Sequence, residues 1–184
     1  MKTIFLASML LLLAPATFAQ VWKPTNYEVA ARIKNAGVNV TSRFTGLKAN
    51  LVFNPNDLAK SSLEASVEVA TVKTGIEKRD KDILEEQYFD AAKYKLIDMR
   101  STKIYKKGDK YAGMFNITMK GVTKAVEVPF DFIRNGNDGE FKGSFGLNRR
   151  DFGIGGKSMM MSDELTVDID LKCTQADKQL THGR

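Results

Sequence analysis

Apolar and polar residues alternate along most of this chain, and this two-residue period limits its fold more than any other feature. The clearest run alternates Leu63, Ala65, Val67 and Val69 with Glu64, Ser66 and Glu68. A period of two places successive side chains on opposite faces of a β-strand. Turn-forming residues separate the runs at 54–57, 108–109 and 135–139. Short turns join antiparallel strands, so the pattern predicts an all-β sandwich or an up-and-down barrel.

The alternation predicts strands over 27–33, 38–53, 63–69, 96–105, 111–119, 126–132, 141–147 and 165–173. The total is eight or nine, depending on whether 38–53 is one strand kinked at Gly46 or two strands. Pro129 cannot donate a ladder hydrogen bond, so an edge or a gap is expected beside it. We favour the barrel, because the inward sets are long and an eight-stranded barrel has room for side chains or one small ligand. Alternation alone fits a well-packed core as well as a ligand-sized cavity.

The alternation stops at Thr74–Asp90, which predicts a short helical insert near residues 75–94. Ile76, Ile83 and Leu84 recur at helical spacing and form one apolar face. Thr71 or Thr74 can cap the start of this helix. An insert of this kind in a closed barrel is positioned to cover an end of the cavity.

Residues 1–19 have the pattern of a secretory signal peptide: Lys2, an apolar run over 4–13, and small residues at Thr17 and Ala19. The apolar run, about ten residues, is too short to span a bilayer, which takes about 20. We expect cleavage near Ala19 and a periplasmic or secreted protein. Residues 20–175 then form one domain, and the polar residues 176–184 a flexible tail. The single cysteine, Cys173, excludes an internal disulfide and favours a bacterial periplasm.

Charge and residue types exclude several functions. The formal net charge of +6 permits transient contact with a membrane surface, but the lysines are too scattered to predict nucleic-acid binding. His182 is the only histidine, which excludes histidine-dependent catalytic triads and histidine-rich metal sites. Three consecutive methionines, Met159–Met161, could suggest copper, but we interpret them as flexible apolar lining of a lipid portal. Cys173 is in phase with the inward set, so a buried, unreactive thiol is expected.

Four motifs together resemble the YceI-like family of periplasmic or secreted, lipocalin-like polyisoprenoid-binding proteins. They are Phe44-Thr45-Gly46, the pattern Thr74-Gly75…Arg79-Asp80…Leu84…Tyr88-Phe89-Asp90, Lys120-Gly121-Val122-Thr123-Lys124, and Asn148-Arg149-Arg150-Asp151-Phe152-Gly153-Ile154. No single motif is decisive, but their order and spacing are specific, and the resemblance covers Val21 to Cys173. The chain departs from the family pattern at Lys95, near which a proline is usual, and near Met99, where an aromatic residue is usual.

The resemblance implies an eight-stranded antiparallel, lipocalin-like barrel around an apolar tunnel. The tunnel would hold an isoprenoid chain, such as a quinone tail or a polyprenyl phosphate, with no cofactor, no metal and no catalytic residue. The side chains expected to line it are Val29, Ile33, Phe44, Leu51, Phe53, Val67, Val69, Met99, Phe115, Ile117, Val128, Phe130, Phe145, Val167 and Ile169. The partner expected is therefore an isoprenoid lipid, and a homodimer is compatible with the sequence.

Candidates for the mouth and head-group contacts are Arg79, Asp80, Tyr88, Phe89, Arg149, Arg150, Phe152 and Met160. Arg79 and Asp80 could contact the head group or form a local pair that pins the helix, and we favour the pair. Arg149 and Arg150 could bind a phosphate or a quinone oxygen through the planar guanidinium, or pair with Asp151 to fix the following loop. Two other functions stay open: a protein that binds or inhibits an exported protein through its surface, and an enzyme that modifies an isoprenoid.

Overall fold

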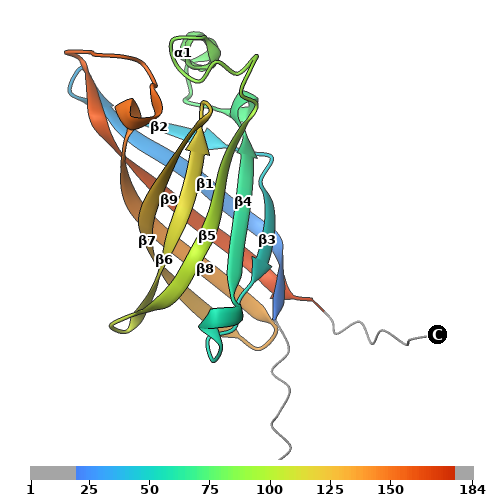
Figure 1. Cartoon of the computed structure of the whole chain (residues 1–184). Helices are drawn as coiled ribbons and strands as arrows, with labels where there is room; N and C mark the ends of the chain where they lie inside the picture. The colour runs from blue at the N-terminus through green and yellow to red at the C-terminus, as the bar shows by residue number, and fades with distance from the viewer. Residues whose placement is uncertain (1–19, 177–184) are drawn as a thin grey trace, which may run out of the picture.

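The first and last strands of the sheet pair with each other and close it into a barrel. The computed structural model describes residues 20–176, so the predicted leader 1–19 and the tail from 177 onward lie outside the described residues (Figure 1). The strands are β1 (Val21–Asn35), β2 (Val38–Phe44), β3 (Lys48–Val52), β4 (Ser62–Glu68), β5 (Leu96–Lys107), β6 (Lys110–Met119), β7 (Val122–Asn135), β8 (Asp138–Asn148) and β9 (Met161–Gln175). Every pairing is antiparallel, and β1 pairs with β9 from Trp22–Gln175 to Asn35–Met161.

The predicted eight-stranded barrel is confirmed, with one difference in how the strands are divided. β2 and β3 both pair with β1, one above the other, so nine strands occupy eight positions around the barrel. Of the two alternatives for 38–53, the structure has two strands and not one kinked strand, and the break falls at Gly46, whose φ is 75°. The hydroxyl of Tyr27 accepts hydrogen bonds from the amides of Gly46 (2.8 Å) and Leu47 (3.2 Å). Those amides have left the ladder, and Tyr27 satisfies them.

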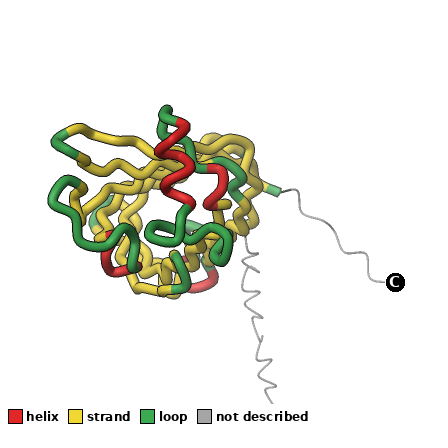
Figure 2. The backbone as a smooth tube through the Cα atoms, turned by 90° about the horizontal axis from the view of Figure 1, so that it is seen from above, coloured by secondary structure: helices red, strands yellow, loops and turns green. Residues whose placement is uncertain are grey.

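The helical insert lies between β4 and β5 and contains α1 (Glu77–Leu84), preceded by the 3₁₀ turn η2 (Val69–Thr71). Seen down the barrel from this end, the insert lies across part of the opening (Figure 2). We call this end the mouth. The predicted helix is confirmed, but neither threonine caps it, because Ile76 holds the N-cap position without a side-chain bond. Ile76 is also 53% exposed, so only Ile83 and Leu84 of the predicted apolar face pack inward.

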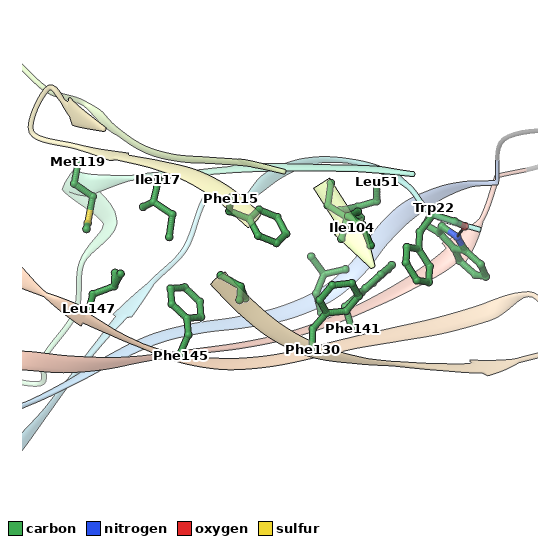
Figure 3. Close-up of a cluster of buried hydrophobic side chains, with 14 of the residues drawn as sticks. Trp22, Leu51, Ile104, Phe115, Ile117, Met119, Phe130, Phe141, Phe145 and Leu147 are labelled. Carbon is green, nitrogen blue, oxygen red and sulfur yellow. Dashed lines mark hydrogen bonds between the residues drawn. The ribbon is translucent and has the colours of Figure 1, made fainter. Parts of the chain in front are cut away.

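The opposite end, which we call the closed end, is filled by aromatic side chains. The ring of Phe53 lies 4.9 to 5.8 Å, between centroids, from those of Tyr111, Phe130, Phe132 and Phe141. Trp22 joins this group, and its indole nitrogen donates to the Phe53 carbonyl at 2.9 Å. Figure 3 shows Trp22, Phe130 and Phe141 gathered at one end of the buried cluster, while Met119, Ile117 and Leu147 lie toward the other. A short 3₁₀ turn, η1 (Leu58–Lys60), follows β3 at this end.

The ladder between β7 and β8 is incomplete, and we call the unpaired part the seam. These strands pair only from Phe130–Gly143 to Asn135–Asp138, next to the closed end. Pro129 stands where the ladder stops, which confirms the gap expected beside it. Toward the mouth the 3₁₀ turn η3 (Arg149–Phe152) contacts β7 and covers the seam. Within residues 20–176, no helix is long and apolar enough to cross a membrane.

Candidate ligand-binding cavity

A cavity of about 430 Å³ lies inside the barrel between the aromatic closed end and the helical insert. Its size falls within the range of roughly 300–1,000 Å³ that is usual for small-molecule sites. Most of its wall is the inward face of the strands, and the alternation explains why that face is apolar. Figure 3 shows Phe115, Ile117, Phe145 and Leu147 facing one another across the interior.

Most of the side chains predicted to line a tunnel do lie in this wall. These are Val29, Ile33, Phe44, Leu51, Val67, Met99, Phe115, Ile117, Val128, Phe130, Phe145, Val167 and Ile169. Two do not. Phe53 is fully buried below the cavity in the aromatic cluster. Val69 is in η2, where β4 has ended and the two-residue phase no longer sets its direction. The expected apolar tunnel is therefore a cavity that aromatic rings close at one end.

Several lining residues were not among the predicted site residues. Leu63, Leu147 and Leu165 belong to the same alternating faces as their predicted neighbours, and Met161 continues the phase of β9 toward the mouth. Extending each alternating run to its end would have found these four. Ile154, in the loop after η3, has no periodic signal, so only the course of the chain reveals it.

The mouth is built by the insert together with the ends of β1, β2 and β9. Arg79, Asp82 and Ile83 of α1 line it, followed by Tyr88 and Phe89. The ring of Phe89 lies edge-on to that of Phe44 on β2, with centroids 6.5 Å apart. This contact joins the insert to the barrel wall and narrows the opening, and Tyr88 and Phe89 therefore occupy the region predicted for them.

Thr74 connects Arg79 to Asp80. The Thr74 amide and hydroxyl donate to the Asp80 carboxylate at 2.8 and 2.6 Å. Arg79 donates through Nε to the Thr74 hydroxyl and through Nη2 to the Thr74 carbonyl, both at 2.9 Å. The favoured local role of these two residues agrees with the contacts, although the pair is bridged and not direct. Within residues 20–176, no hydrogen bond is formed by Nη1 of Arg79, and Nη2 uses one of its two N–H groups, so the side chain keeps donors that can meet a ligand.

The stability of this insert should depend on pH through Asp80. The hydrogen bond from the Thr74 hydroxyl holds the pKa of Asp80 below its ordinary 3.8, and Lys73 and Arg79 act in the same direction. A carboxyl whose pKa is lower in the folded state stabilises that state above its unfolded pKa and loses this effect as the pH falls through its folded pKa. We therefore expect Asp80→Asn to melt below the wild-type temperature at neutral pH. The difference should shrink once the pH falls below 3.8.

Thermal unfolding followed by circular dichroism over a pH series measures this difference. Asp82→Asn is the matched control, because Asp82 makes an exposed pair with Lys78 on the same helix. Its effect should be small at every pH. A melting difference for Asp80→Asn that does not shrink at all as the pH falls well below 3.8 would contradict the assigned role, because protonation of Asp80 should remove the advantage of the wild type.

Arg149 is almost completely buried, with a side-chain exposure of 2%, and the chain itself takes all of its donors. Nε donates to the Ser162 carbonyl, Nη1 to those of Ile154 and Gly156, and Nη2 to the Met161 carbonyl and the Asp163 carboxylate. Five donors meet five acceptors, which leaves none for a head group. The loop-fixing alternative is the one that these contacts support, with Asp163 as the acidic partner in place of the predicted Asp151.

Arg149 forms part of the cavity wall, whereas three further mouth candidates lie away from it. Arg150 is half-exposed and pairs with Asp163 at 3.3 Å. Phe152 is 1% exposed and packs in the core beneath η3. Met160 is 66% exposed on the outside of the mouth. Asp80 also lies outside the lining, because Thr74 and Lys73 hold it.

Cys173 lies near the closed end, and its thiol donates to the Gly139 carbonyl at 3.2 Å. Burial raises the pKa of this thiol to about 11. Little thiolate forms at neutral pH, which agrees with the predicted buried, unreactive cysteine. Among the described residues, no three His, Cys, Asp or Glu side chains gather in a group that could hold a metal ion.

Comparison with known proteins gives a consistent result. Residues 21–173 match the YceI-like domain family. The UPF0312 protein of Photorhabdus laumondii is 27% identical over 150 residues, which cover 81% of this chain and 76% of that protein. The crystal structure of Burkholderia cenocepacia BcnA superposes with a TM-score of 0.77 at 25% identity, covering 80% of this chain and 96% of BcnA. A polyisoprenoid binding domain from Saccharophagus degradans shares the fold, with a TM-score of 0.66 at 14% identity and coverage of 87% and 100%.

Proposed function

Because the chain belongs to the YceI-like family, we propose that it is a binding protein that holds an isoprenoid lipid in the cavity of its barrel. The observation that carries this proposal is the cavity itself, which is apolar along its walls and closed at one end. The description of the Saccharophagus degradans domain as polyisoprenoid-binding agrees with this ligand class.

The energy of burying a hydrocarbon tail is enough for such a ligand without a strong polar contact. Each buried CH₂ contributes roughly 0.8 kcal/mol, so ten carbons, or two isoprene units, would contribute about 8 kcal/mol. Ordering the flexible tail and the loss of translational freedom offset part of this gain. The longer the part of the tail that the cavity covers, the tighter the expected binding.

The polar end of the ligand would lie at the mouth. The closed end offers aromatic rings, whereas the mouth offers the unused N–H donors of Arg79. A guanidinium nitrogen donates well to a phosphate or a quinone oxygen. Arg79 would therefore orient the ligand, while the strands supply most of the affinity.

The protein would act as a carrier, store or sequestering protein and would perform no chemistry on the lipid. The leader-like pattern of residues 1–19 supports export to the periplasm or beyond. In that compartment a tail buried inside a barrel would be shielded from water.

Filling the cavity should abolish binding. Ala65 lies in the wall, so Ala65→Trp would place an indole in the space that the tail needs. Native mass spectrometry of gently purified wild-type protein should show added mass in the lipid range, and Ala65→Trp should lose it. Titration with a short-chain quinone should give an affinity at least about 100-fold weaker for the variant, the equivalent of losing three to four buried CH₂ groups.

Ala125→Trp is the matched control, because Ala125 is exposed on the outside of β7 and does not line the cavity. It should bind the quinone like the wild type. A wild-type chain that shows only its own mass and binds neither the quinone nor a polyprenyl phosphate would overturn the proposal. Capture of an exported protein that persists in Ala65→Trp would instead favour the surface-binding alternative.

A further inference from the structure

Three large apolar side chains are exposed together beside the mouth. Val38 is 65% exposed, Met159 102% and Met160 66%. Val38 follows the turn between β1 and β2, and the methionines immediately precede β9. The amide of Ala36 donates to the carbonyl of Met160 at 2.8 Å, so the two segments touch. Figure 1 shows this hairpin and this loop projecting together from the α1 end of the barrel. We call Val38, Met159 and Met160 the apolar tip.

Folding of the barrel does not explain these exposed side chains. Singly exposed apolar residues are common, but adjoining ones on two contiguous segments indicate a surface that meets something apolar. The three residues of the tip include no aromatic anchor of the kind that dominates protein interfaces. It presents two flexible methionines and one valine on a loop and a hairpin that project from the barrel, an arrangement suited to insertion among lipid tails.

The charge around the tip selects the kind of lipid surface. Residues 34–41 and 153–162, which carry the tip, contain two exposed lysines, Lys34 and Lys157, and no carboxylate. Along the chain, the acidic residues that flank the second segment are Asp151, which is exposed, and Asp163, which pairs with Arg149 and Arg150. Lysines beside an inserted apolar group are attracted by anionic head groups, each contributing the equivalent of a roughly five-fold gain in binding.

The tip is continuous with the cavity wall. Val40 on β2 and Met161 on β9 line the cavity, and they lie next to Val38 and Met160 along their segments. The same elements therefore carry apolar side chains both at the exposed tip and at the mouth of the cavity. A lipid tail moving from a bilayer around the tip would reach Val40 and Met161 with little exposure to water.

We propose that the apolar tip inserts into the surface of an anionic lipid bilayer and docks the mouth against it. Lys34 and Lys157 then lie at the level of the head groups, and the cavity opens toward the tails. Membrane docking rests on the tip alone, whereas the role of docking in lipid transfer rests on the proposed function.

Vesicle flotation tests the docking. The purified chain is mixed with vesicles of equal parts phosphatidylglycerol and phosphatidylcholine, or of phosphatidylcholine alone. All variants are purified with the same N-terminus as the wild type, and mass spectrometry verifies this for each of them. The wild type should bind the anionic vesicles, and Met159→Ser with Met160→Ser should reduce binding at least about ten-fold. Lys34→Glu with Lys157→Glu should reduce binding to the anionic vesicles by at least roughly thirty-fold and leave binding to phosphatidylcholine alone unchanged.

Matched controls come from the closed end of the barrel. Ile133 is 55% exposed there, so Ile133→Ser removes a comparable apolar surface. Lys23→Glu with Lys106→Glu reverses two exposed charges at the same end. Both controls should float like the wild type. Equal binding by tip variants and controls, or no vesicle binding by the wild type, would overturn the docking proposal.

A second measurement separates docking from the function of the cavity. The tip variants should bind a short-chain quinone in solution like the wild type, because the tip lies outside the cavity wall. Quinone binding without vesicle binding would refute docking and leave the cavity proposal standing. Tip-dependent vesicle binding without quinone binding would refute the cavity proposal and leave docking standing.

Discussion

Arg149→Ala is expected to lower the free energy of unfolding by about 3–5 kcal/mol, the usual cost of breaking a buried ion pair from one side. The change removes all five hydrogen bonds of the guanidinium and leaves four loop carbonyls without their donors. It also leaves the Asp163 carboxylate without its shortest partner. Urea unfolding followed by circular dichroism measures the loss, with an unchanged m value as evidence that the folded state keeps its compactness.

Two further variants separate the geometry of the guanidinium from its charge. Arg149→Lys keeps the charge, but three donors on a single nitrogen cannot satisfy acceptors spread from Ile154 to Asp163, so most of the loss should remain. Arg150→Ala removes the neighbouring arginine, which is half-exposed and shares the same Asp163. It should cost less than about 1 kcal/mol. Equal losses for Arg149→Ala and Arg150→Ala would show that burial and the loop carbonyls do not matter.

Removal of the Arg149 side chain should also change the structure of the mouth. This residue holds η3 and the loop through Gly156 against the start of β9, next to the seam where β7 and β8 do not pair. Ile154, whose carbonyl Arg149 binds, lines the cavity. We therefore regard Arg149 as a structural residue that shapes the opening, which is a different role from the head-group contact considered from the sequence.

The alternation predicted which face of each strand points inward, and this was enough for most of the wall. Val167 and Ile169 could be assigned to the cavity because a strand that keeps its phase cannot turn one of them outward without turning both. The same reasoning gave the barrel and the position of the insert at one end. It failed where the chain leaves the ladder, as at Val69, because there the period no longer determines direction.

The two-residue alternation does not predict how far along the barrel axis a residue lies. Leu51 and Phe53 share a face two residues apart, yet one lines the cavity and the other closes its end. The difference arises because rings from distant strands, those of Tyr111, Phe130 and Phe141, converge at the level of Phe53. The acceptors of Arg149 were equally hidden, since four of the five are backbone carbonyls whose positions depend on the course of residues 154–162.

Phe53→Ala is expected to cost about 3–5 kcal/mol of unfolding free energy, the usual range for truncating a buried phenylalanine. Phe53 has no exposed surface and contacts four aromatic rings, so the neighbours cannot collapse fully into the space it leaves. Urea unfolding gives the free energy. Trp22 is the only tryptophan and is 1% exposed in the same cluster, so its fluorescence reports on the closed end directly. Its emission should shift to the red in the folded variant as water approaches the indole.

The same variant tests whether Phe53 forms the floor of the cavity. Leu51, two residues away on the same face, already lines it, so removing the Phe53 ring should deepen the space toward Trp22. If the proposed ligand is held there, the co-purifying lipids should shift toward longer tails while the stability falls. Ile133→Ala is the control, because this exposed side chain points outward at the same end, and it should change the unfolding free energy by less than about 0.5 kcal/mol. A small loss for Phe53→Ala with unchanged Trp22 emission would mean that the other rings close this end by themselves.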